Sequence, residues 1–259
     1  MGYSEDQLRA DVIKEFSSEE TLKSYEHAVA SIGMWQSERM LIEKYFSRGN
    51  SVLDVGCGTG RTTFPLFEMG YDVLGVDITP GMIERAQHLA QSRNTAIPFE
   101  VGDATRLRFD DASFDQALFS FNGWCQIPMR SKRQQALNEL HRVVLHGGYV
   151  IFTSHIRRRF DSHSAAWAQE WLKHRVGSYI GLFDPGDLEY GDIFFTRTDP
   201  GPTGSHAFHQ YIHIPSLKEV EHMIDAAGFT LVESAYRNSI ATEDARLESG
   251  NCRFFVCKK

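Results

Sequence analysis

The sequence predicts a doubly wound α/β fold, because short apolar runs alternate with helical patterns along most of its 259 residues. The first run, residues 51–55, leads into a glycine-rich turn, and two later runs end at Asp77 and Asp103. In a parallel sheet, side chains at the carboxyl ends of neighbouring strands face one crevice. The order of runs and acids therefore predicts a ligand site at that edge of the sheet.

Each element has its own local signal. Apolar residues at 35, 40–42 and 45–46 indicate an amphipathic helix, Thr79-Pro80 is a typical helix start, and Gly228 is a typical helix end. The predicted helices are 5–31, 35–46, 60–69, 80–93, 129–144 and 215–228. The predicted strands are 51–55, 72–76, 97–101, 114–120, 148–154, 229–236 and 252–257.

The decapeptide at residues 52–61, Val-Leu-Asp-Val-Gly-Cys-Gly-Thr-Gly-Arg, is the most informative stretch of the chain. Glycine lets the backbone approach a ligand closely and present its N–H groups. A dinucleotide fingerprint requires G-x-G-x-x-G, and Arg61 stands where its last glycine would be. The spacing D-x-G-x-G-x-G instead resembles motif I of the class I S-adenosylmethionine-dependent methyltransferases.

Three further landmarks follow motif I at spacings similar to those of this family. Asp77 ends the second strand, Asp103 ends the third, and residues 114–121 resemble the family's fourth strand. Residues 140–154 resemble the helix end, Gly-Gly turn and fifth strand. The resemblance covers residues 35–155 closely and implies a Rossmann-like seven-stranded sheet whose last strand is antiparallel.

The resemblance implies S-adenosylmethionine as the cofactor. Asp77 would bind the ribose, Asp103 and Ala104 the adenine, and the Phe119 backbone the amino group, while Asp54 would support the glycine loop. The full set expected to bind the cofactor is Asp54, Gly56, Gly58, Gly60, Asp77, Ile78, Asp103, Ala104, Phe119, Tyr25 and Trp35.

Four segments are expected: an N-terminal helical cap (1–50), the cofactor-binding core (51–155), an insertion (156–214), and the closing helix and strands (215–259). A connection as long as 156–214 is usually functional. It contains a helical stretch with His163, Trp167 and Trp171, then a hairpin of Asp192–Arg197 against Ala207–Ile214. Two interpretations stay open: a lid over the acceptor pocket, or tryptophans that pack the insertion onto the sheet.

Methyl transfer from a sulfonium chiefly requires orientation, and a base only where the acceptor must lose a proton. The candidate catalytic residues are His155, His209 and His213. Candidate acceptor-binding residues are Asn122, Gln126, Arg157, Trp167, Trp171 and Tyr211. Arg157, Arg158 and Arg159 are consecutive. Two interpretations stay open: they bind an anionic acceptor together, or they form a solvated surface. No metal is expected, because His206, His209, His213 and His222 have no cysteine or carboxylate at ligand spacing.

Composition narrows the function further. The net charge of −7 argues against a broad surface for binding nucleic acid. The sequence contains no run of 18 apolar residues, so no membrane-spanning helix is expected. No signal peptide is expected at the start of the sequence. The four cysteines, with no C-x-x-C pair, indicate reduced thiols and a cytoplasmic protein. The expected partner is a small-molecule methyl acceptor. An RNA or protein methyltransferase, an aminopropyl transferase and a non-catalytic cofactor-binding module remain alternatives.

Overall fold

The structure, a computed structural model, describes residues 2–157, 164–182, 184–201, 204–246 and 252–259. Its centre is a seven-stranded sheet with strand order β3-β2-β1-β4-β5-β9-β8. The strands are β1 Ser51–Val55, β2 Asp72–Asp77, β3 Phe99–Val101, β4 Phe114–Phe119, β5 Val144–Ser154, β8 Thr230–Tyr236 and β9 Arg253–Lys258. β9 pairs antiparallel with both neighbours, whereas β1 to β5 are parallel, so the predicted fold class is confirmed.

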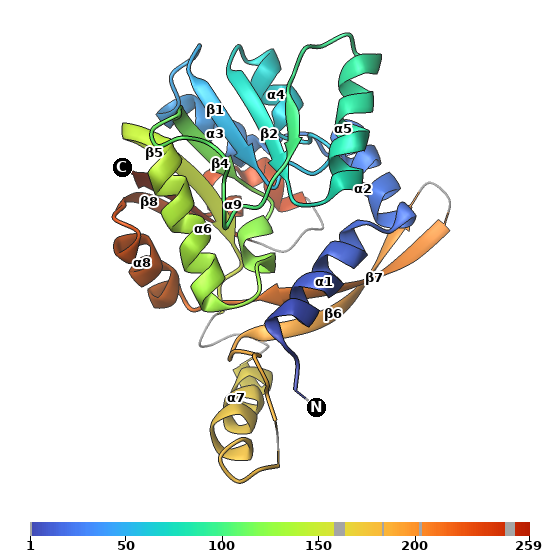
Figure 1. Cartoon of the computed structure of the whole chain (residues 1–259), viewed down its shortest axis with the longest axis vertical. Helices are drawn as coiled ribbons and strands as arrows, with labels where there is room; N and C mark the ends of the chain where they lie inside the picture. The colour runs from blue at the N-terminus through green and yellow to red at the C-terminus, as the bar shows by residue number, and fades with distance from the viewer. Residues whose placement is uncertain (1, 158–163, 183, 202–203, 247–251) are drawn as a thin grey trace.

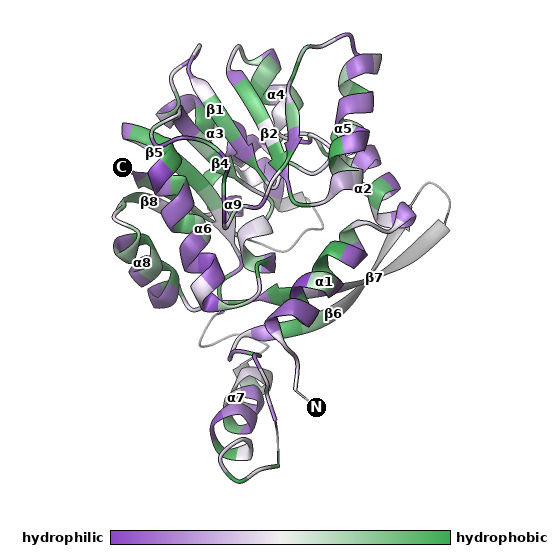
Figure 2. Cartoon of the chain, in the orientation of Figure 1, coloured by the Kyte–Doolittle hydropathy of each residue, from purple (hydrophilic) through white to green (hydrophobic). Residues whose placement is uncertain are grey.

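Helices cover both faces of the sheet (Figure 1). On one face α6 and α8 join a buried apolar cluster, and on the other α3, α4 and α5 join a second. The helices of the sheet layers are α3 Gln36–Tyr45, α4 Thr63–Glu68, α5 Pro80–Ser92, α6 Arg130–Val143, α8 Leu217–Ala226 and α9 Arg237–Ile240. Figure 2 shows the hydropathy that goes with this arrangement, with apolar strands between helices that carry hydrophilic residues.

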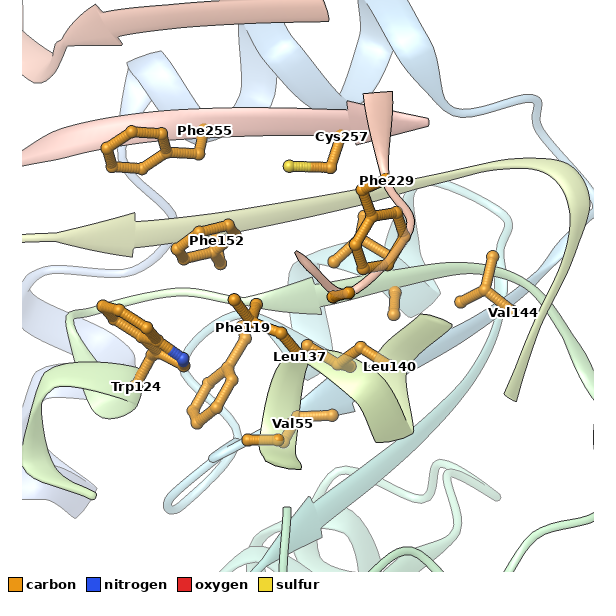
Figure 3. Close-up of a cluster of buried hydrophobic side chains, with 14 of the residues drawn as sticks. Val55, Phe119, Trp124, Leu137, Leu140, Val144, Phe152, Phe229, Phe255 and Cys257 are labelled. Carbon is orange, nitrogen blue, oxygen red and sulfur yellow. The ribbon is translucent and has the colours of Figure 1, made fainter. Parts of the chain in front are cut away.

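Aromatic rings dominate the cluster under α6 and α8. Phe152 of β5 stacks on Phe255 of β9 with ring centroids 5.1 Å apart, and Trp124 lies 5.4 Å from Phe152 (Figure 3). Trp124 is fully buried, and its indole N–H donates to the Arg133 carbonyl at 3.1 Å. This packing fixes the connection after β4, a single 3-10 turn (η1 Gly123–Gln126), against the sheet.

Two predicted elements differ in their bounds for local reasons. The helix expected over 5–31 is two helices, α1 Glu5–Phe16 and α2 Glu19–Ser31. The Ser17 hydroxyl donates to the Ile13 carbonyl, and the Ser18 side chain accepts from the Thr21 N–H, so α1 ends and α2 is capped there.

The strand expected at 148–154 begins earlier, at Val144. The Gly-Gly pair forms an irregularity within β5, where the register with β4 shifts between Phe114 and Gln116.

The insertion contains the predicted helix and hairpin. α7 spans Ser164–Leu172 and continues as a π-helical turn, η2 Lys173–Gly177. β6 Asp192–Gly201 and β7 Gly204–His213 form an antiparallel two-stranded sheet, longer than predicted, in which Asp192 pairs with His213. A short 3-10 helix, η3 Thr242–Arg246, follows α9. No helix among the described residues is both long and apolar enough to cross a bilayer. The four-segment division of the chain stays a prediction.

The glycine loop has a measurable packing requirement at Gly60. Its φ is +97°, and a Cβ there would lie 2.6 Å from the Phe64 ring and 3.3 Å from Phe99. Gly49 offers a matched control, because its φ is +81° and no atom lies within 4 Å of the same Cβ position. We expect Gly49→Ala to cost about 1 kcal/mol of unfolding free energy, and Gly60→Ala about 1–3 kcal/mol more through overpacking. Urea unfolding of both variants measures this, and equal losses would contradict the role of the phenylalanine rings.

Candidate functional site

A pocket opens at the carboxyl edge of the sheet, where β1, β2, β3 and β4 end. Its empty space of about 880 Å³, open mouth included, is within the usual range for small-molecule sites. The strand ends contribute Val55, Gly56, Gly58, Asp77, Ile78, Gly102, Asp103, Ala104, Phe119 and Ser120. Other segments contribute Arg9, Val12, Ile13, Phe16, Tyr25, Thr79, Met82, Thr105, Phe121, Gly123, Gln126, Ile127 and Pro128.

Asp54 lies beneath the glycine loop rather than in the pocket wall. Its Oδ2 accepts hydrogen bonds from the hydroxyls of Thr62, at 2.8 Å, and Thr63, at 2.6 Å. Burial raises the pKa of Asp54 to about 6, and the two threonine bonds offset this only in part. The carboxylate thus ties β1 to the start of α4 across the loop.

Asp77 is a wall residue that also shapes the loop. Its Oδ2 accepts from the Gly58 N–H at 2.9 Å, and its Oδ1 accepts from the Thr79 N–H at 2.8 Å. Burial raises its pKa, against the effect of these two bonds. A carboxylate has about four acceptor positions, so Asp77 keeps capacity for ligand hydroxyls after binding both N–H groups.

Asp103, at the end of β3, is paired within the protein. Its Oδ1 accepts from the Thr105 N–H and hydroxyl, each at 2.8 Å, and its Oδ2 lies 2.7 Å from Arg9 Nη2 of α1. Burial raises the pKa of Asp103, but the bonds from Thr105 and Arg9 together outweigh it and hold the pKa below its ordinary value. The acid predicted to meet adenine is therefore joined to α1.

The roof of the pocket is formed by α1, within the segment expected to be an N-terminal helical cap, but its individual wall residues were not predicted. Arg9, Val12, Ile13 and Phe16 of α1 line it, and none was singled out from the sequence. A signal existed, because the apolar residues follow each other at i, i+1 and i+4 on one helical face.

Tyr25 and Trp35 take different positions. Tyr25 lines the pocket beside the glycine loop, where a Cβ on Gly58 would lie 3.4 Å from its ring. Trp35 is only 2% exposed and is not a wall residue; its ring lies 5.1 Å from the Phe121 ring, which does line the pocket.

Glu38 of α3 joins the segments around this end of the pocket. Its carboxylate binds the Arg61 guanidinium in bidentate fashion at 2.6 and 2.8 Å. The same carboxylate accepts hydrogen bonds from the Ser120 hydroxyl and from the backbone N–H of Trp35. The Glu38 side chain is fully buried. Arg61 also donates to the Gly33 carbonyl at 2.7 Å. Neither residue was recognised from the sequence, because their pairing spans 23 positions.

The connection after β4 separates its two predicted residues. Gln126 lines the pocket, whereas Asn122 is buried away from it, and the Asn122 N–H donates to the Thr153 hydroxyl at 2.7 Å. Phe121 and Asn122 both have positive φ, 56° and 62°. This uncommon backbone turns the Phe121 side chain into the pocket wall.

None of the described wall residues is a histidine. His155, at the end of β5, has its pKa lowered to about 4 by burial and by the nearby Arg237 charge. His213 is 1% exposed and lies between two carboxylates, with Nδ1 2.6 Å from Asp192 and Nε2 3.3 Å from Glu219. The side chain of His209 is outside the described part of the chain. The catalytic roles of all three stay predictions.

The described candidate residues of the insertion, Arg157, Trp167, Trp171 and Tyr211, are not wall residues of the pocket. Arg157 donates to the Ile214 carbonyl at 2.9 Å, and its guanidinium lies over the rings of Tyr190 and Trp167, 4.1 and 5.5 Å from their centroids. Trp171 is 49% exposed. Tyr211, 3% exposed, donates to Asp192 at 2.8 Å. Arg158, Arg159 and His163 lie outside the described residues.

The hairpin instead supports the roof from outside. Tyr3 stacks on Phe194 of β6 with centroids 5.0 Å apart, and the Glu5 N–H donates to Asp187 at 2.8 Å. Figure 1 shows α1 lying along β6 and β7, with the sheet edge on its other side. Thus α1 lies against the pocket and the hairpin of the insertion lies behind α1, and a lid role for the insertion stays a prediction.

One cluster offers ligand atoms for a metal ion: Glu189, Asp192 and His213 lie within 4.8 Å of one another. From the sequence spacing we expected no carboxylate beside His213. That expectation is wrong, because cross-strand pairing brings Asp192 beside this histidine. Arg133 lies 2.5 Å from Glu189 and supplies a positive charge at the same place. The cluster is thus an internally paired network.

Comparisons with known proteins agree with this geometry. Residues 52–148 match a family described as a methyltransferase domain. A protein of Geobacillus sp. (strain WCH70) that carries a provisional methyltransferase name is 28% identical over 87% of this chain and 92% of its own length. The malonyl-[acyl-carrier protein] O-methyltransferase of Serratia marcescens is 30% identical over 60% of this chain, which spans 58% of that protein.

Two solved structures share the fold. A SAM-dependent methyltransferase from Methanosarcina mazei has a TM-score of 0.65 at 22% identity, covering 88% of this chain and 98% of its own. The 1,6-didemethyltoxoflavin-N1-methyltransferase of Burkholderia thailandensis, solved with 1,6-didemethyltoxoflavin and S-adenosylhomocysteine bound, has a TM-score of 0.62 at 17% identity. It covers 99% of this chain and 91% of its own.

Asp54 and His155 should have opposite effects on the stability of the protein as pH changes. Asp54 has its pKa raised from 3.8 to about 6, so the folded state keeps a proton that the unfolded state loses, and stability falls by about 3 kcal/mol as pH rises through this window. His155 has its pKa lowered from 6.5 to about 4, so its contribution to stability rises with pH across a similar window.

Between about pH 4 and 6.5, we expect the thermal midpoint of Asp54→Asn to increase more steeply with pH than that of wild type. The thermal midpoint of His155→Gln should decrease with pH relative to that of wild type. Calorimetric melts of wild type and both variants across this range measure the two slopes. Equal slopes in the two variants would contradict the assignment.

Proposed function

We propose that the chain is a class I S-adenosylmethionine-dependent methyltransferase that methylates a small-molecule acceptor by in-line displacement. The observation that carries the proposal is the convergence of Gly56, Gly58, Asp77 and Asp103 on one pocket at the carboxyl ends of β1, β2 and β3. That pocket is closed above by the apolar face of α1, which leaves room for a small ligand rather than a polymer surface.

The residues present fit the cofactor. We infer that the loop backbone at Gly56 and Gly58 lies under the methionine end and that Asp77 binds the ribose hydroxyls with its remaining acceptor positions. Ile78 would pack on the adenosine. Asp103 and the Ala104 N–H would bind adenine, and the Phe119 carbonyl the amino group. Asp54 and Gly60 support the loop from below.

The bound cofactor supplies a methyl group made electrophilic by its sulfonium. The protein's part is orientation, which in favourable cases lowers a barrier by roughly 7–11 kcal/mol. Val12, Ile13 and Phe16 exclude water from above, and the Gln126 amide offers a hydrogen bond for an acceptor heteroatom. No histidine lines the described pocket, so we assign most of the rate enhancement to positioning of the acceptor rather than to proton abstraction.

A small-molecule acceptor is also favoured by charge and by relatives. The net charge of −7 disfavours a nucleic-acid partner. The Burkholderia thailandensis enzyme is titled as an N1-methyltransferase of 1,6-didemethyltoxoflavin, a small molecule. A cytoplasmic location belongs to the same proposal, supported by four buried cysteines without a disulfide.

The acceptor class is tested by incubating the protein with methyl-labelled cofactor and a cell extract split by ultrafiltration. We expect label in the small-molecule fraction and none in RNA or protein. Label confined to a polymer would replace the proposal by an RNA or protein methyltransferase. Cofactor binding with no label transferred to any fraction would favour a non-catalytic binding module.

The ribose assignment predicts a loss of cofactor affinity in Asp77→Ala. We expect the dissociation constant by calorimetry to rise at least about tenfold, because two bonds to a charged acceptor are lost. Asp72→Ala is the matched control, since Asp72 is an exposed carboxylate at the other end of β2. An unchanged dissociation constant in a folded Asp77→Ala protein would refute the assignment.

A further inference from the structure

The segment that follows Trp167 exposes large apolar side chains in unusual density. Six of them lie within twelve residues, and we name this set the apolar tip: Trp171 (49% exposed), Leu172 (53%), Val176 (41%), Tyr179 (90%), Ile180 (55%) and Leu182 (82%). Contiguous apolar exposure of this kind marks an interaction surface. None of the six lines the pocket.

The apolar tip projects from the molecule. Figure 1 shows α7 standing apart from the sheet and its helices, joined to them only at the base. Trp167 forms that anchor, because its ring meets Tyr190 edge-on at 6.5 Å and Arg157 lies over both rings. A convex projection has no groove for a peptide, but it meets a flat, deformable surface without hindrance from the rest of the protein.

The charges beside the apolar tip differ from those of the whole chain. Lys173, His174 and Arg175 stand between Leu172 and Val176, although the chain carries a net charge of −7. Glu170 is 3.4 Å from Lys173 and is the one acid in 164–182. Cations interleaved with Trp, Tyr and aliphatic side chains are typical of segments that lie in a lipid interface.

We propose that the apolar tip inserts into the headgroup region of an anionic phospholipid bilayer. Aromatic and aliphatic side chains would enter the interface, and Lys173 and Arg175 would meet lipid phosphates. This is a peripheral contact, so it departs from the expectation of no membrane partner without requiring a spanning segment. It does not depend on methyl transfer.

Sedimentation with vesicles tests the proposal on the full chain without cofactor. We expect binding to phosphatidylcholine vesicles that contain phosphatidylserine, weaker binding to phosphatidylcholine alone, and release by salt. The triple variant Tyr179→Ser, Ile180→Ser, Leu182→Ser should lose at least about tenfold in partition coefficient, because three large apolar groups no longer leave water. Val232→Ser, an exposed apolar position on β8, is the matched control and should bind like wild type.

Trp171 provides a direct spectroscopic readout. Its fluorescence should shift to the blue with anionic vesicles, and Trp171→Phe should remove the shift while circular dichroism stays unchanged. Absence of wild-type binding, or equal binding by the triple variant, would overturn the proposal. Light scattering that shows a dimer in wild type and a monomer in the triple variant would also overturn it, and would assign the apolar tip to a second copy of the chain.

Discussion

The buried ion pair between Glu38 and Arg61 is the contact on which the arrangement around the pocket depends. It joins α3 to the end of the glycine loop, and through Ser120 it reaches the end of β4. A charge pair this deeply buried adds little net stability, because both ions lose their hydration, but removing one partner leaves the other uncompensated at a cost of about 3–5 kcal/mol. The pair therefore fixes where three segments stand relative to one another.

Aromatic rings complete this junction. The Arg61 guanidinium lies 5.0 Å from the Trp35 ring and 4.5 Å from the Phe121 ring, and Phe121 faces the pocket. A planar guanidinium can bind a carboxylate edge-on and stack on rings with its faces, which a lysine could not do. The position of Phe121 in the pocket wall is thus set jointly by Arg61 of the loop and by Trp35 at the start of α3.

The sheet and the floor of the pocket were predictable because their signals are local. Glycines, apolar runs and the acids at 54, 77 and 103 lie within short segments whose geometry follows from strand and turn chemistry. The roof was not predictable in the same way, since Arg9 meets Asp103 across 94 positions. The surroundings of His213 were not predictable either, because cross-strand pairing with Asp192, 21 positions away, encloses this histidine in the interior.

The attachment of α1 to the hairpin has a consequence for how the protein is made. The Glu5 backbone N–H at the start of α1 donates to Asp187, which is synthesised 182 residues later. The strands up to β5 have already been synthesised by then, so the floor of the pocket precedes the segment that supports its cover. Nascent chains that stop short of the insertion lack the contacts that hold α1 over the pocket.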